Sequence, residues 1–66
     1  MIDMTYRVYL RWTDKTTTDK TTTEDEHVAD TAFSRLRERT DLRGKSVGVA
    51  YTRDGKQMDY FDIDSA

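Results

Sequence analysis

The stretch TEDEHVADTAFSRLRERT, residues 23–40, decides the fold because it has the pattern of one amphipathic helix. Its apolar residues recur at i, i+3 and i+4 and form a single stripe of Val28, Ala29, Ala32, Phe33 and Leu36. Thr23 followed by Glu26 predicts a capping box at the helix start. Acidic residues in the first turn and arginines in the last turns match the helix dipole. We expect the rest of the chain to cover this stripe.

Strand patterns lie on both sides of the helix. Residues 5–13 alternate strictly, with one apolar face made of Tyr6, Val8, Leu10 and Trp12. Residues 47–52 alternate in the same way, and residues 57–63 follow after Asp54-Gly55, a strong signal for a two-residue hairpin turn. Pairing outward from that turn sets Tyr51 opposite Met58 and Val49 opposite Tyr60. The sequence therefore predicts three strands.

A threonine-rich segment, DKTTTDKTTT, separates the first strand from the helix at residues 14–23. Asp and Thr suit turns and helix starts, which favours a polar connection. Such a connection could be a hairpin-like extension of the first strand, because Thr also favours an extended backbone. An interaction loop is the alternative.

The element order predicts one α+β domain spanning residues 1–66, with a two-layer β-α-β-β architecture. A right-handed crossover would make the first two strands parallel, with the third strand between them in the order 1-3-2. This order sets Arg7 and Arg11 across from Asp59, where opposite charges stabilise a sheet modestly. The alternative order 3-2-1 leaves both arginines without such partners. One helix would then pack on one face of a three-stranded antiparallel sheet.

Composition limits the classes of function. The chain has no cysteine, which excludes a disulfide framework and thiolate metal sites, and no apolar run long enough to cross a membrane. We therefore expect a cytoplasmic protein. A domain of 66 residues has little stability to spare, so a homodimer or a partner complex is plausible beside a monomer.

No catalytic constellation stands out. His27 lies in the first helical turn without an orienting partner. Asp59, Asp62 and Asp64 do not converge, because the first points to the opposite face of a strand from the other two. We predict that the protein is not an enzyme and that it uses no metal and no cofactor.

Two surfaces are candidates for binding. The net charge is −2, but 36% of the residues are charged and the two signs are unevenly distributed. Carboxylates that could occupy a groove meant for phosphates are Glu24, Asp25, Glu26, Asp30, Asp59 and Asp62. The open face of the sheet is expected to display residues able to stack single-stranded bases, namely Arg7, Tyr9, Arg11 and Phe61.

The net acidity argues against a nucleic-acid partner. A homodimer contact through Tyr9 and Phe61 is the other explanation for the open face. A basic block near the C-terminal end of the helix, made of Arg37, Arg39, Arg43 and Lys45, could contact phosphate, but the helix dipole together with Glu38 and Asp41 accounts for it.

Three segments resemble short proteins carried by bacterial mobile elements and phages. They are KTTTDKTTTEDEHVADTAF at residues 15–33, LRERTDLRGK at residues 36–45 and YTRDGKQ at residues 51–57. Small, acidic, cysteine-free proteins of this kind are similar to anti-CRISPR inhibitors. The resemblance implies a protein that binds a surveillance complex and blocks its DNA-binding surface with negative charge.

The sequence thus predicts a small non-catalytic inhibitor in a bacterial cytoplasm. It would act as a DNA mimic, docking its carboxylates onto a basic surface of a CRISPR effector complex or another larger host protein, with no membrane involved. The alternatives are a nucleic-acid-binding module that uses the open sheet face and a homodimeric accessory protein of a mobile element.

Overall fold

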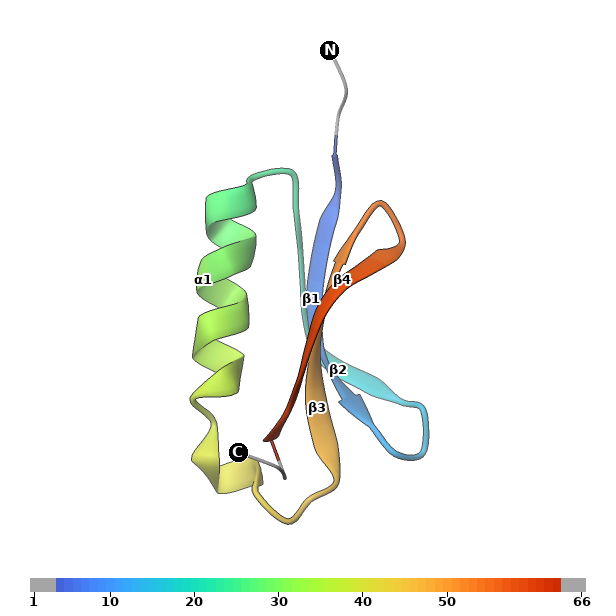
Figure 1. Cartoon of the computed structure of the whole chain (residues 1–66), viewed down its shortest axis with the longest axis vertical. Coiled ribbons are helices and arrows are strands. Elements are labelled where there is room, and N and C mark those ends of the chain that lie inside the picture. Colours follow the sequence, from blue (N-terminus) through green and yellow to red (C-terminus); the bar gives the residue numbers. More distant parts are fainter. Residues whose placement is uncertain (1–3, 64–66) are drawn as a thin grey trace.

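The computed structural model describes residues 4–63, and Asp64 lies outside this range. Within it, four strands form one antiparallel sheet, and one helix covers one face (Figure 1). The elements in chain order are β1 (Tyr6–Trp12), β2 (Thr17–Thr23), α1 (Glu26–Arg37), the short 3-10 helix η1 (Thr40–Leu42), β3 (Val47–Arg53) and β4 (Lys56–Asp62). The strand order is β2-β1-β3-β4. The α+β class is confirmed, whereas the prediction of three strands in the order 1-3-2 is wrong.

The additional strand is β2, which comes from the threonine-rich segment. The Asp14 carboxylate accepts hydrogen bonds from the Thr16 amide at 3.0 Å and the Thr16 hydroxyl at 2.6 Å, and Lys15 has a φ of 73°. This turn folds β2 back onto β1, and the Trp12 indole donates to the Thr18 hydroxyl at 2.8 Å. The polar connection therefore has the form of a hairpin-like extension of the first strand.

This extra strand explains the error in the sheet order. A hairpin before α1 returns the chain to the end of the sheet where β1 begins. The helix then carries the chain to the opposite end, so β3 enters antiparallel to β1 and pairs with it directly. β4 follows by the tight turn and occupies the edge. Arg7 and Arg11 therefore pair with Thr52 and Gly48, as in the rejected order, and not with Asp59.

The turn between β3 and β4 has the predicted form, because Asp54 and Gly55 have φ values of 52° and 81°. The register beyond it differs from the prediction by one residue. Gln57 pairs with Thr52 and Asp59 pairs with Tyr51, which leaves Met58 as the extra residue of a bulge. Beyond Met58, each side chain of β4 therefore lies on the opposite face from the one predicted.

α1 begins two residues later than the capping box predicts. Asp25 is the N-cap, and its carboxylate accepts from the His27 amide at 2.9 Å, while the Thr23 hydroxyl accepts from the Asp25 amide. Ala29 and Phe33 are buried, as the stripe predicts. Val28 is 44% exposed, because it lies at the edge of the stripe beside β2.

The core lies between α1 and the sheet. Its buried residues are Tyr6, Val8, Leu10, Ala29, Phe33, Leu42, Val47, Val49, Tyr51 and Ile63. The rings of Tyr6 and Phe33 each meet the ring of Tyr51 edge to face, at centroid distances of 6.2 and 5.4 Å. Among residues 4–63, no helix has the length and apolar character needed to span a membrane.

Candidate functional site

The face of the sheet that α1 does not cover is the most distinctive surface. We call it the open face. Both hairpin turns lie on this side, one at each end of the sheet (Figure 1). The strand register assigns to the open face Arg7, Tyr9 and Arg11 of β1, Thr17 and Thr22 of β2, Gly48, Ala50 and Thr52 of β3, and Gln57, Tyr60 and Asp62 of β4.

These residues form rows across the strands. The middle row runs from Tyr9 through Ala50 to Tyr60. On one side of it lies the row of Arg11, Gly48 and Asp62, and on the other the row of Arg7, Thr52 and Gln57. The small residues of β3 thus lie between larger side chains of β1 and β4.

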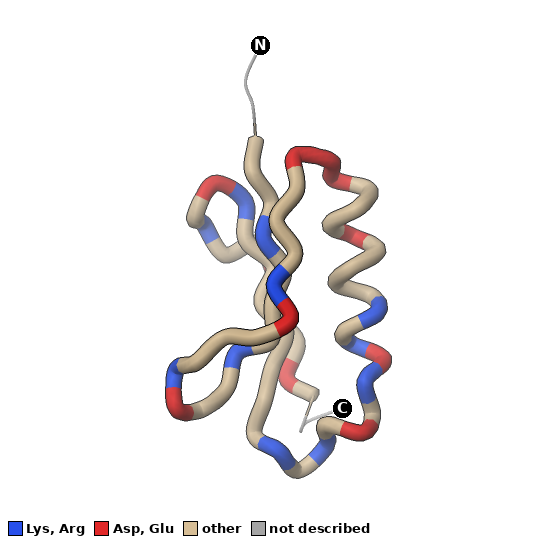
Figure 2. Tube along the Cα trace, turned by 180° about the vertical axis from the view of Figure 1, so that it is seen from behind, with Lys and Arg blue, Asp and Glu red and all other residues tan. Residues whose placement is uncertain are grey.

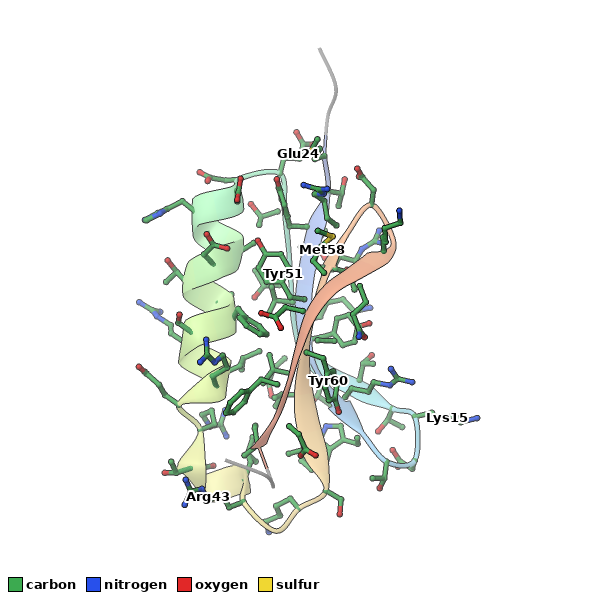
Figure 3. The ribbon with its side chains drawn as sticks, viewed as in Figure 1. Lys15, Glu24, Arg43, Tyr51, Met58 and Tyr60 are labelled. Carbon is green, nitrogen blue, oxygen red and sulfur yellow. The ribbon has the colours of Figure 1, made fainter. Side chains whose placement is uncertain are left out.

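All three small residues of β3 are buried although no helix covers them. Their neighbours fold over them. The Tyr60 hydroxyl and ring carbon Cζ occupy the space that a Cβ atom on Gly48 would need, so the Tyr60 side chain reaches from its own row into the next. Its side chain lies on the side of β4 away from α1, opposite to that of Tyr51 (Figure 3). Tyr60 remains 42% exposed.

Four exposed cations surround this row. Arg7 and Arg11 come from β1, Lys20 comes from β2, and Lys15 comes from the turn between these strands. The Lys20 ammonium lies 5.9 Å from the centre of the Tyr9 ring, a cation–π contact. The acidic residues beside these cations are Asp62 of β4 and Asp14, which lies in the same turn as Lys15 and accepts hydrogen bonds from Thr16. The surface is therefore positively charged in a protein whose net charge is −2.

Two shallow hollows on this face have similar linings. The Tyr9 hollow, of about 490 Å³, is lined by Tyr9, Arg7 and Lys20. Threonines of β2 and β3 and Gly55 of the β3–β4 turn complete its lining. The Tyr60 hollow, of about 350 Å³, is lined by Tyr60, Arg11 and Lys15, with Asp62 and the start of β3. Each hollow combines one tyrosine, one arginine and one lysine.

The structure brings together three of the four residues predicted for the open face. Phe61 is the exception, because the bulge at Met58 turns it toward α1, where it is half-buried against the core. The Arg37 guanidinium lies 4.9 Å from its ring centre and 5.4 Å from that of Phe33. Tyr60 takes the place on the open face that the prediction gave to Phe61.

The predicted acidic surface is divided between two sides of the molecule. Glu24, Asp25, Glu26 and Asp30 lie in the loop before α1 and its first turns, which we call the acidic end (Figure 2). Asp59 lies on the same side of the sheet, since it pairs with Tyr51. Asp62 lies on the open face, in the row of Arg11.

Two members of the acidic end have structural partners. Asp25 caps α1, and Asp30 accepts a hydrogen bond from the Tyr51 hydroxyl at 2.9 Å. Burial, followed by the hydrogen bond to the Asp30 carboxylate, raises the pKa of Tyr51 to about 12. Tyr51 therefore keeps its proton and anchors α1 to β3.

The basic block lies on the α1 side, near the C-terminal end of the helix (Figure 2). Arg39 forms an ion pair with Asp41 at 2.9 Å, and the hydrogen bond between them raises the pKa of Arg39 and lowers that of Asp41. Arg37 stacks on two phenylalanine rings. Structural contacts thus engage part of this block, whereas Arg43 and Lys45 are exposed.

His27 and the aspartates of β4 are the residues considered for catalysis and metal binding. His27 is exposed on the first turn of α1. Within residues 4–63, no group of three or more His, Cys, Asp or Glu side chains is placed to hold a metal ion.

Sequence reasoning missed Tyr60, Lys15 and Lys20 as members of this surface. Tyr60 was hidden by the bulge, which has no sequence signature in KQMDY. The two lysines were hidden by the interpretation of their segment as a loop. The β propensity of its threonines is the signal that could have identified them.

Comparison of the chain with protein-family models, with curated proteins and with solved structures finds no match to any of them.

Proposed function

We propose that this protein is a non-catalytic binding module that holds a negatively charged polymer against its open face. The observation that carries the proposal is the grouping of Arg7, Arg11, Lys15 and Lys20 on one face of an acidic protein. The helix dipole does not account for these cations, because none of them is in a helix. A positive, concave surface raises the local concentration of anionic ligands.

The test compares two double charge reversals by fluorescence anisotropy at low salt. Labelled single-stranded DNA, duplex DNA of the same sequence and polyglutamate serve as probes. R7E/R11E removes open-face charge, and R35E/R43E makes the same change in net charge on the α1 side, where Figure 3 labels Arg43. All four arginines are exposed, so the fold should tolerate both double substitutions.

We expect at least one probe to bind, and R7E/R11E to weaken it by about tenfold or more, since two phosphate or carboxylate contacts become repulsive. The control should stay within about threefold of wild type. Circular dichroism must show that both variants remain folded. Failure to bind any of the three probes, or equal losses in both variants, would overturn the proposal.

A second candidate function rests on the acidic end, where residues 24–30 contain four carboxylates and no lysine or arginine. In this form the protein is an inhibitor in a bacterial cytoplasm that docks onto a basic DNA-binding surface, as the resemblance to anti-CRISPR proteins implies. Glu24 and Glu26 are the residues to test, because Asp25 caps the helix and Asp30 holds Tyr51. E24K/E26K should weaken binding to labelled polylysine if this candidate is correct and leave it unchanged otherwise.

A further inference from the structure

The row of Tyr9, Ala50 and Tyr60 offers more than positive charge. Its two rings come from strands on either side of β3, and the residue between them is the smallest side chain that still has a Cβ. Two strand spacings, roughly 10 Å, separate the backbones that carry the rings. The two rings line separate hollows of the same face, Tyr9 in one and Tyr60 in the other.

Gly48 fixes the position of one of these rings. The Tyr60 hydroxyl and Cζ lie where a side chain on Gly48 would be, so the end of the Tyr60 side chain lies over Gly48, and Tyr60 remains 42% exposed. Gly48 does not have a positive φ, so its backbone conformation does not require a glycine. Its function in the structure is to make room for Tyr60.

Each ring has its own pair of cations. Arg7 and Lys20 share a hollow with Tyr9, and Arg11 and Lys15 share one with Tyr60. A ring that can stack on a base, beside two cations that can bind phosphate, matches the chemistry of a nucleotide. The same combination occurs twice within one surface, although Asp62 also lines the Tyr60 hollow, and a repeated combination matches a polymer of nucleotides.

Two tyrosine rings distinguish between classes of anionic polymer. Acidic polypeptides and duplex DNA would satisfy the cations, but polypeptide carboxylates have no ring to stack, and the bases of a duplex are already stacked on one another. The bases of a single strand have free π faces. Lys20 contacts the Tyr9 ring through an exposed cation–π interaction, which a base can displace while the ammonium moves to a phosphate.

We propose that the ligand of the open face is single-stranded nucleic acid, with one base stacked on Tyr9 and another on Tyr60. This inference rests on the proposed function, because it specifies the polymer that the same face binds. Arg7, Arg11, Lys15 and Lys20 bind the backbone, and the tyrosines select for unpaired bases.

The experiment measures the binding of the same three probes by Y9A, Y60A, Y60F and G48A. We expect wild type to bind the single strand at least about tenfold more tightly than the duplex or polyglutamate. Y9A and Y60A should each weaken single-strand binding by about 5- to 100-fold, the range that loss of one stacked base produces. Y60F keeps the ring and should bind within about threefold of wild type.

G48A is the sharpest variant, because the new methyl group displaces Tyr60 without touching any charge. The displaced atoms are the far end of an exposed side chain, so we expect the fold to remain while single-strand binding falls toward that of Y60A. Melting curves of both variants check the fold. If a variant fails to fold, the comparison of Y60F with Y60A on wild-type Gly48 still tests the stacking.

The outcomes separate this inference from the proposed function. Equal binding of all three probes that depends on Arg7 and Arg11 but not on Tyr9 or Tyr60 overturns the inference and leaves the proposed function intact. Preferred binding of duplex or polyglutamate does the same. Absence of binding to every probe overturns both. A dimer in light scattering that Y60A dissociates would assign the open face to a second copy and would also overturn both.

Discussion

Tyr51 shows how one side chain joins the two layers of this protein. It extends from β3 into the core, meets the rings of Tyr6 and Phe33, and donates a hydrogen bond from its hydroxyl to Asp30 on α1. Tyr60, nine residues later, points to the opposite side and ends over Gly48. Two tyrosines of one hairpin therefore have separate roles, one in the core and one on the open face.

The raised pKa of Tyr51 leads to a prediction about alkaline stability. The ordinary pKa of tyrosine is 10.0, and burial beside Asp30 raises that of Tyr51 to about 12. The folded protein thus holds this proton to a higher pH than the unfolded chain does. The stabilisation is fully present below pH 10 and is lost as the pH rises from 10 to about 12, with a magnitude of roughly 1–3 kcal/mol.

Ultraviolet titration of tyrosinate in wild type and Y51F measures this directly. The difference between the two curves should have its midpoint near pH 12. Denaturant unfolding between pH 9 and pH 12 should show a steeper loss of stability in wild type than in Y51F. A midpoint near pH 10 would contradict the contact with Asp30.

At the scale of elements, α1 was predictable because its signal is redundant. The 3.6-residue period, the dipole-matched charges and the central position of Phe33 all agree, and the structure has a helix of 12 residues within the predicted stretch. Its first residue was not predictable, because Thr23, Asp25 and Glu26 all favour helix starts. The Asp25 carboxylate, two residues before His27, makes the cap by accepting a hydrogen bond from the His27 amide.

The N-cap supplies a test at this scale. D25A removes the acceptor for the His27 amide and should lower the free energy of unfolding by about 1 kcal/mol. For a chain of this size, that corresponds to a decrease in melting temperature of roughly 4–8 °C. E24A is the matched control, since it removes the same charge from the preceding position and should shift the melting temperature by less. A decrease of this size in T23A, with no decrease in D25A, would show that Thr23 is the N-cap, as the capping box predicts.

β2 was not predictable from hydrophobic alternation because it buries almost nothing. Its sequence TTDKTTT has no apolar residue, and only Thr21 and Thr23 are half-buried. Burial is what produces a two-residue period, so an exposed edge strand leaves only the weak β propensity of threonine. The prediction of the sheet order was wrong as a consequence, because leaving out one strand reverses the direction in which β3 enters the sheet.

The register of β4 failed for a different reason. Counting outward from Asp54-Gly55 is valid only while both strands advance together, and the bulge at Met58 ends that correspondence. The error of one residue exchanged Phe61 and Tyr60 between the two faces. Arg7, Tyr9 and Arg11 were assigned correctly, because β1 alternates strictly over its whole length.

The whole molecule separates its charges onto different sides. The acidic end and the basic block lie at the two ends of α1 and complement the dipole of that helix, whereas the cations of the open face lie on strands and a turn (Figure 2). This separation would allow a protein with a net charge of −2 to bind an anion on its open face, as we propose. The net charge describes the sum, whereas a ligand meets one face.

This separation predicts the salt dependence of binding. Four cations face the ligand, so the logarithm of the association constant for a single strand should fall with the logarithm of salt concentration with a slope no steeper than about −3. R7Q should reduce the slope by somewhat less than one unit. E24Q lies outside the open face and should leave the slope unchanged. A steeper slope, or one that E24Q alters, would mean that the ligand also contacts other cations.

Both outer strands of the sheet contain an inserted residue. In β2, Asp19 and Lys20 together oppose Tyr9 of β1, and Asp19 has a φ of 53°; in β4 the insertion is at Met58. A straight threonine-rich strand would be a good template for joining copies into fibrils through backbone hydrogen bonds. Bulges bend the edge of a sheet, so we expect both borders to be poor templates for pairing with a second copy, and the charges of Asp19 and Lys20 on β2 act in the same direction.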